Sequence, residues 1–148
     1  MDNIDQQLIE LLQNDGRMTV SDLSKQLSLS RPSISERLFR LQDKGIIERF
    51  SAIVSPKAVG RDTLLFIQIS ELKTSPQEFE EFIKNDVDIL ECHRVTGPVS
   101  HFLKAAVGGM EGLQMLVDRL IPFGNINTSI ALKSAVEHRN IIPINKLT

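Results

Sequence analysis

Hydrophobic residues at the start of the chain recur at the spacing of a helix. Ile4, Leu8 and Leu11 follow one another at intervals of four and three residues, which is typical of the buried stripe of an amphipathic helix. Gly16 then allows the left-handed backbone with which helices commonly end. A capping box that begins at Thr19 predicts a second helix of about two turns. The pattern therefore predicts two short N-terminal helices.

A third helix is predicted after a short polar break. Ser30 suits its N-cap and Pro32 suits its first turn, where a missing N–H does no harm. Ile34, Leu38 and Leu41 then form an apolar stripe within about 60° of one another around the helix axis. Two short helices, a tight turn and a longer helix predict a helix-turn-helix, whose second helix enters the major groove of DNA by its N-terminal turns.

Alternating strand and helix periods beyond residue 60 predict a second domain. Short apolar or alternating runs indicate strands, and Ser75-Pro76-Gln77-Glu78 has the cap, proline and acidic residue of a helix start. The order βαββαβ predicts a ferredoxin-like domain, one sheet backed by two helices, so the fold class is α+β. The expected elements are strands over residues 64–72, 89–95, 101–107 and 128–136 and helices over residues 75–85 and 110–120.

Two segments connect these domains. Residues 46–54 are rich in β-formers and predict a short strand that couples the helix-turn-helix to the rest of the chain. Residues 55–60 contain the proline and glycine expected of a connection. We therefore expect a helix-turn-helix domain over residues 1–54, a hinge over residues 55–60 and a ferredoxin-like domain over residues 61–148.

Composition narrows the class of protein. The 148 residues are 41% hydrophobic and 24% charged, which is typical of a soluble globular protein and excludes a globally disordered chain. The chain has no apolar run near the roughly 20 residues of a membrane span, and its N-terminus is acidic where a secretory signal is basic. The single cysteine, Cys92, agrees with a reducing compartment. We therefore expect a cytoplasmic protein that does not bind membranes.

A net charge of −2 means that any contact with DNA must be local. The start of the third helix offers such a contact, because small hydrogen-bonding side chains stand where an exposed helix more often has Ala, Glu or Lys. Two arginines further along are candidates for contacts with phosphates or bases. The alternative is a three-helix bundle whose stripes are purely structural and whose arginines are solvated. The candidate DNA-binding residues are Ser30, Arg31, Ser33, Ser35, Arg37 and Arg40.

A combined spacing of motifs runs through the first 60 residues. It comprises Asp5, the run from Leu11 to Arg17, Leu23, the run from Leu27 to Ile34, then Arg37, Leu38, Leu41 and the run from Gly45 to Ile47, followed by the run from Val54 to Lys57 and Gly60. This pattern resembles the leucine-responsive/asparagine-regulator (Lrp/AsnC) family of transcription factors. The resemblance implies a winged helix-turn-helix head that binds double-stranded DNA sequence-specifically and regulates transcription.

The second half of the chain is similar to the assembly and effector domain of the same family, chiefly through the run from Val95 to Leu103. The resemblance implies homodimers that associate into octamers or similar rings, with a small effector, usually an amino acid, between dimers. Thr128 matches a threonine-rich stretch that lines the family's effector cleft. Thr128 equally suits an ordinary strand.

The turn between the second and third expected strands departs from the family's pattern. Family members usually carry Gly-x-x-Asp there, and the carboxylate receives the amino group of the ligand. This chain keeps Gly97, has Ser100 at the aspartate position and has Pro98 between them, which removes a backbone donor. A glycine at position 97 is also expected if the residue serves only to form the turn. The effector-binding prediction therefore rests on Gly97, Ser100 and Thr128, and the missing carboxylate predicts weak binding of amino acids.

The sequence offers no arrangement of residues for catalysis or metal binding. The histidines lie far apart in the expected elements and lack a carboxylate cluster. Cys92 and His93 are adjacent on an expected strand, so their side chains point to opposite faces and cannot form a nucleophile–base pair. We therefore expect no enzyme, no metal and no cofactor.

The favoured interpretation is a DNA-binding transcription regulator that forms oligomers and senses a small effector. One alternative keeps DNA binding without the switch: an architectural protein that wraps or bends DNA as a constitutive multimer. Another alternative is an enzyme whose ferredoxin-like half turns over a metabolite, against which the absence of acid–base and metal-binding residues argues. A ligand that raises the melting temperature would separate the first two interpretations.

Overall fold

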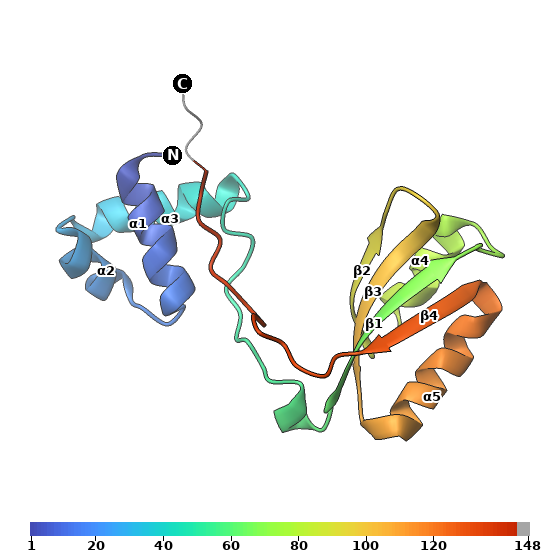
Figure 1. Ribbon diagram of the computed structural model, residues 1–148. Helices are drawn as coiled ribbons and strands as arrows, with labels where there is room; N and C mark the ends of the chain where they lie inside the picture. The colour runs from blue at the N-terminus through green and yellow to red at the C-terminus, as the bar shows by residue number, and fades with distance from the viewer. Residues whose placement is uncertain (145–148) are drawn as a thin grey trace. The chain divides into compact units, whose positions relative to one another are not determined.

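The structure, a computed structural model, describes residues 1–144 and consists of an all-helical part and a part built on a sheet (Figure 1). The chain divides into two compact units. The N-terminal unit contains Met1–Ile53 together with the C-terminal segment that starts at Val136, and the sheet unit contains Val54–Ala135. The sequence-based division into residues 1–54, 55–60 and 61–148 stays a prediction.

The N-terminal unit contains the three helices expected from the apolar stripes. Asp2 and Thr19 begin the first two helices with capping boxes, and the Ser30 hydroxyl caps the third. One fully buried side chain from each of α1 and α2 packs with two from α3. The core of this unit is therefore small: Leu8, Leu23, Ile34 and Leu41. The helices are α1 (Asn3–Asn14), α2 (Val20–Leu27) and α3 (Arg31–Asp43).

The strand expected over residues 46–54 is absent from the structure, and this expectation was wrong for the single chain. A strand needs a neighbouring strand for its N–H and C=O groups, whatever its β-propensity. The segment has no such neighbour within the described chain, and its side chains Phe50, Ile53 and Val54 are exposed. The β-rich composition therefore marks an extended connection.

The sheet unit has the expected βαββαβ order. Its strands form one antiparallel sheet in the order β2-β3-β1-β4. Short 3-10 turns at Lys57–Val59 and Ile121–Phe123 complete the order of elements. The elements are β1 (Thr63–Ser70), α4 (Pro76–Lys84), β2 (Ile89–Arg94), β3 (Val99–Val107), α5 (Gly109–Leu120) and β4 (Asn125–Ile130).

The last strand begins three residues earlier than the expected range of 128–136 and ends six residues earlier. β4 pairs with β1 from Asn125, opposite Ser70, to Ile130, opposite Leu65. Because β1 begins at Thr63, almost no partner residues remain beyond Ile130. The alternation that continues to Val136 in the sequence therefore has no strand to pair with.

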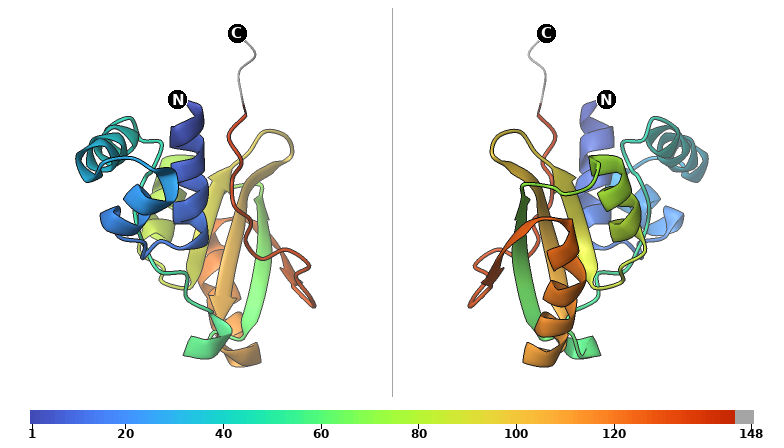
Figure 2. Two further views of the ribbon diagram at one scale, coloured as in Figure 1. Left: turned by 90° about the vertical axis from the view of Figure 1, so that its left-hand side faces the viewer. Right: turned by 90° about the vertical axis from the view of Figure 1, so that its right-hand side faces the viewer.

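The two α-helices of the sheet unit, α4 and α5, cover the same face of the sheet (Figure 2). Alternate residues of β1 and β3 point to this face and pack against α4 and α5, as the period of two requires. The opposite face carries Phe66 and Phe102, which are 47% and 41% exposed. The core of the sheet unit is Leu65, Ile67, Ile69, Phe79, Ile83, Leu103, Ala105, Val107, Leu116 and Leu120.

Among residues 1–144, no helix has the length and apolar character needed to span a bilayer.

Candidate functional site

A tight turn joins α2 to α3 and sets the start of α3 at the surface. Ser28 ends α2 in the left-handed conformation, with a φ of 52°. The Leu29 N–H donates to the Ser24 carbonyl at 3.1 Å, which closes the turn. The Ser30 hydroxyl then accepts from the Ser33 N–H at 3.3 Å. This cap satisfies one of the free N–H groups at the N-terminus of α3 and leaves others available to an anion.

Four of the six predicted DNA-binding residues surround this helix start. Ser30, Arg31 and Ser35 are exposed, and Ser33 is half-buried. The Arg31 guanidinium donates to the Ser21 hydroxyl at 3.0 Å, so it lies between α2 and α3. The structure thus brings together the small polar groups that the sequence singles out.

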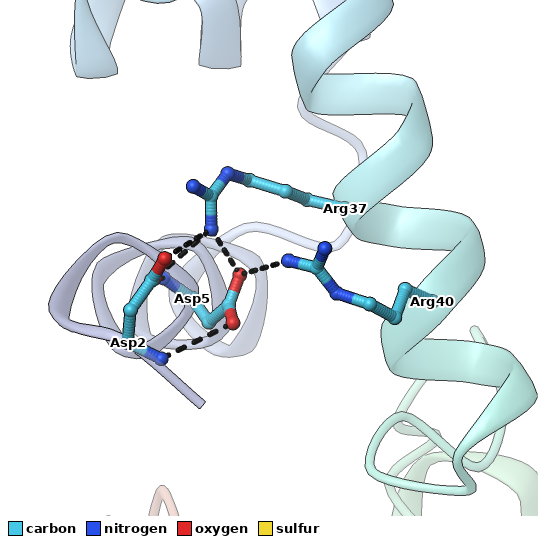
Figure 3. A network of polar contacts seen from close by, with 4 residues as sticks. All are labelled: Asp2, Asp5, Arg37 and Arg40. Atoms are coloured by element: carbon cyan, nitrogen blue, oxygen red, sulfur yellow. Dashed lines mark hydrogen bonds and ion pairs between the residues drawn. The ribbon is translucent and has the colours of Figure 1, made fainter.

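The two remaining arginines lie beside the start of α1 (Figure 3). Arg37 Nη1 lies 2.7 Å from Asp2 Oδ2 and 2.7 Å from Asp5 Oδ1. Arg40 Nη2 approaches the same Asp5 oxygen at 3.4 Å. Asp5 is 4% exposed, so its carboxylate is buried and depends on these partners. We call this group of four residues the α1–α3 clasp.

The charges of the α1–α3 clasp reinforce one another. The carboxylates of Asp2 and then Asp5 raise the pKa of Arg37 above its usual value. The backbone N–H of Asp5 and then the Arg37 guanidinium lower the pKa of Asp2. Arg37 therefore holds α3 against α1 in this structure, and its contact with DNA stays a prediction. Arg40, whose side chain is 41% exposed, is the freer of the two arginines.

Sequence reasoning missed the structural role of Asp2 and Asp5. It treated Asp5 only as part of a family motif, although one signal was present. Asp5 lies one residue after Ile4 and three before Leu8, on the side of the helix that faces the core. A carboxylate at such a position requires a cationic partner.

The predicted effector turn connects β2 to β3. Gly97 is exposed and has a φ of 106°, a conformation that favours glycine. The Val95 N–H donates to the Ser100 carbonyl at 3.0 Å and closes the turn. The Ser100 hydroxyl lies 2.8 Å from Nδ1 of His101. The hydroxyl at the family's aspartate position is therefore bonded to a residue of its own chain.

His101 is fully buried and links this turn to α4. Its Nε2 lies 3.0 Å from Glu80 Oε1, and its ring packs edge-on against Phe79 with centroids 4.9 Å apart. Arg94 Nε donates to the same Glu80 oxygen at 2.7 Å. Arg94 and then His101 lower the pKa of Glu80 to about 2. We call Ser100, His101, Glu80 and Arg94 the turn network.

Thr128 does not join Gly97 and Ser100 within one chain. It lies on β4, where its partner across the ladder is Ile67 of β1. Strand β1 separates β4 from β3, which carries Ser100. Within one chain, Thr128 therefore lies two strands away from the strand that carries Ser100.

The structure supports the expected separation of Cys92 from His93. Cys92 packs against the core between the sheet and the helices, whereas the His93 side chain is 67% exposed. Among residues 1–144, no group of three or more His, Cys, Asp and Glu side chains is placed to hold a metal ion.

Comparisons with known proteins match both parts of the chain. Residues 1–48 match a family described as winged helix-turn-helix DNA-binding, and residues 64–141 match the Lrp/AsnC ligand binding domain. YezC of Bacillus subtilis, an HTH-type transcriptional regulator, is 33% identical over 138 residues, which are 93% of this chain and 98% of YezC. The proline dehydrogenase transcriptional activator of Rhizobium radiobacter is 29% identical over 144 residues, 93% of this chain and 92% of the activator.

Two solved structures share the whole architecture. A transcriptional regulator from Neisseria meningitidis in complex with L-methionine superposes with a TM-score of 0.90 and 27% identity, covering 100% of this chain and 99% of that one. A feast or famine regulatory protein from M. tuberculosis complexed with L-methionine gives a TM-score of 0.87 and 29% identity, covering 96% and 99%. The predicted fold class, a winged helix-turn-helix followed by an α+β sheet domain, is confirmed.

Proposed function

This chain belongs to the Lrp/AsnC family of transcriptional regulators, and from that premise we propose that the start of α3 docks in the major groove of DNA. The observation that carries this proposal is the exposed, serine-rich helix start that follows the α2–α3 turn. Small hydroxyl groups and free N–H groups at a helix N-terminus suit contacts with phosphates and base edges. The residues that face DNA in this proposal are Ser30, Arg31, Ser33 and Ser35, with Arg37 and Arg40 behind them.

Binding rests on a few local phosphate contacts, because the chain has a net charge of −2. Each phosphate that is neutralised releases counterions, so affinity falls steeply with salt. We expect fluorescence anisotropy of the full-length protein with duplex DNA to show this dependence.

Arg40→Ala tests the interface directly. The variant should weaken binding to specific and random duplexes alike and flatten the slope of log affinity against log salt by about one unit. Lys84→Ala is the matched control, because Lys84 is an exposed cation on α4, outside the helix-turn-helix. An unchanged slope in Arg40→Ala would remove Arg40 from the interface.

The open face of the sheet supports a second part of the proposal, that copies of the chain pair there as homodimers. Phe66 and Phe102 lie on adjacent strands, where Phe102 is opposite Gln68, two residues from Phe66. Large apolar groups on an uncovered sheet face are typical of an interface. Dimers would then associate into an octamer or a similar ring. Sedimentation of the full-length protein should show at least a dimer, and Phe66→Ser should shift it toward the monomer.

The effector cleft of this chain differs from one built for free amino acids. L-methionine is bound in the Neisseria and M. tuberculosis relatives. In this chain a neutral hydroxyl replaces the expected carboxylate and is bonded to His101. A buried ammonium requires an anionic partner, so we expect weak or no binding of free amino acids. Calorimetry against L-methionine and the other common amino acids tests this, and micromolar binding of any one would refute it.

Because the Ser100 hydroxyl is already bonded to His101, a second candidate function is favoured. In this function the chain is a constitutive architectural protein that wraps DNA without an amino-acid switch. In that case DNA affinity and footprint stay unchanged on addition of every amino acid tested. Either way, the chain acts in the cytoplasm by binding and not by catalysis.

A further inference from the structure

Phe39 is a large apolar side chain that α3 leaves in solvent. Its side chain is 71% exposed, whereas Ile34 and Leu41 of the same helix are 0% and 1% exposed. At 100° per residue, Phe39 lies about 130° around the helix axis from this buried stripe. Ser35 and Glu36, both exposed, lie on the same outward side. Phe39 therefore lies on the same outward face of α3 as Ser35, one of the predicted DNA-binding residues.

Packing within the N-terminal unit gives no reason for this aromatic ring. The core of the unit closes around other side chains, and Phe39 is neither one of its buried residues nor among those packed against them. An exposed phenylalanine keeps its apolar surface in water until a partner covers it.

Charge around Phe39 points to the chemistry of that partner. The Arg37 guanidinium, two residues away, is held by Asp2 and Asp5. Glu36 adds an exposed negative charge on the outward face. Arg40, the freer of the two arginines, remains the candidate for a phosphate contact, and the ring of Phe39 itself offers an apolar contact. In the major groove, the apolar group on a base edge is the 5-methyl group of thymine.

We propose that Phe39 is a specificity-determining residue that packs its ring against a thymine 5-methyl group in the major groove. The proposal rests on the docking of α3 described above and extends it to a base. Phe39 lies two turns beyond the helix start, so it would contact a base pair next to those reached by the N-terminal serines.

Selection from a random duplex library, carried out in parallel with the wild-type protein and Phe39→Ala, tests this proposal. We expect the wild-type protein to select thymine at one position of each half-site and the variant to lose that preference. Phe39→Leu keeps an apolar side chain and should retain part of it. Val87→Ala, which changes an exposed apolar residue of the sheet unit, should select the same sequences as the wild type.

Replacing the selected thymine with deoxyuridine removes only the methyl group. The wild-type protein should lose affinity by about fourfold for each thymine replaced, the scale of burying one methyl group, and Phe39→Ala should lose none. Equal losses in both proteins, identical selected sequences, or a change of oligomeric state in Phe39→Ala would overturn the proposal. Failure of the wild-type protein to bind any duplex would instead overturn the docking of α3 itself.

Discussion

Among residues 1–144, each of the two units has one polar residue that is buried as a whole, Asp5 in the N-terminal unit and His101 in the sheet unit. We expect the two units to differ in how strongly their stability depends on that residue. In the N-terminal unit the buried Asp5 carboxylate is held by two arginines of α3, beside a core of four residues. In the sheet unit the buried His101 imidazole is held by Ser100 and Glu80, beside a core of ten residues. The Asp5 carboxylate links α3 to α1, and the His101 imidazole links the β2–β3 turn to α4. Because the core of the N-terminal unit is small, we expect its buried charge to be essential to the fold, whereas we expect the larger core of the sheet unit to tolerate replacement of the imidazole.

Removing the buried charge of the N-terminal unit should have the largest effect. Asp5→Ala leaves Arg37 and Arg40 without their buried carboxylate and breaks the capping box of α1. We expect the N-terminal unit to lose about 3–4 kcal/mol of unfolding free energy. Hydrogen exchange read by mass spectrometry should show this loss in residues 1–53 and not in the sheet unit. The chain has no tryptophan or tyrosine, so exchange is more informative than intrinsic fluorescence.

Glu10→Ala is the control on the same helix, because Glu10 is exposed. It should change the unfolding free energy by less than about 0.5 kcal/mol. If Asp5→Ala changed the unfolding free energy as little as Glu10→Ala, the ion pairs of the α1–α3 clasp would contribute little to stability. The contrast between the two units would then disappear.

Giving the sheet unit a carboxylate of its own should have the next largest effect. Ser100→Asp places an acid at the position where the family usually has one, beside the imidazole of His101. We expect calorimetry to show new affinity for amino acids worth about 1.5–3 kcal/mol, the scale of a charge-assisted hydrogen bond. Ser100→Asn, which is similar in size and uncharged, should not bind. Equal behaviour of the two variants would show that charge at residue 100 does not decide effector binding.

In both units the sequence predicts local features better than contacts between distant parts of the chain. Caps at Thr19, Ser30 and Ser75 and the apolar periods predict each of the α-helices found among residues 1–144, because these signals are local. The strand expected over residues 46–54 failed, because a strand depends on a partner that the local sequence does not reveal. The same limit hid the α1–α3 clasp, in which Asp5 meets Arg37 across 32 residues of sequence. It also hid the bond between Ser100 and His101, since burial of His101 comes from the packing of α4.

Replacing the buried imidazole should have a small effect, in contrast to Asp5→Ala. His101→Phe fills a similar volume beside Phe79 and removes the polar group together with its need for partners. We expect the unfolding free energy of the sheet unit to change by less than about 1.5 kcal/mol, measured by hydrogen exchange in β3 and α4. His101→Ala, which leaves a cavity, should cost more, about 2–4 kcal/mol. A His101→Phe variant as damaged as His101→Ala would mean that the turn network, like the α1–α3 clasp, is essential.

The smallest effect should come from the titration of Glu80. Arg94 and then His101 lower the pKa of Glu80 to about 2, from an ordinary value of 4.5. A carboxylate whose pKa is lower in the folded state stabilises the fold above its unfolded pKa, and this contribution is lost as the pH falls through the folded value. The sheet unit should therefore lose stability progressively between pH 4.5 and about 2.

Glu80→Gln should flatten this part of the pH profile, whereas Glu81→Gln, on the exposed side of α4, should keep it. The exposure of Glu80, at 32% of its side chain, lets solvent screen the interaction. For this reason, we expect the difference between the two profiles to be smaller than any change predicted above. A wild-type profile that is already flat over this range would show that the turn network holds the β2–β3 turn by geometry and not by charge.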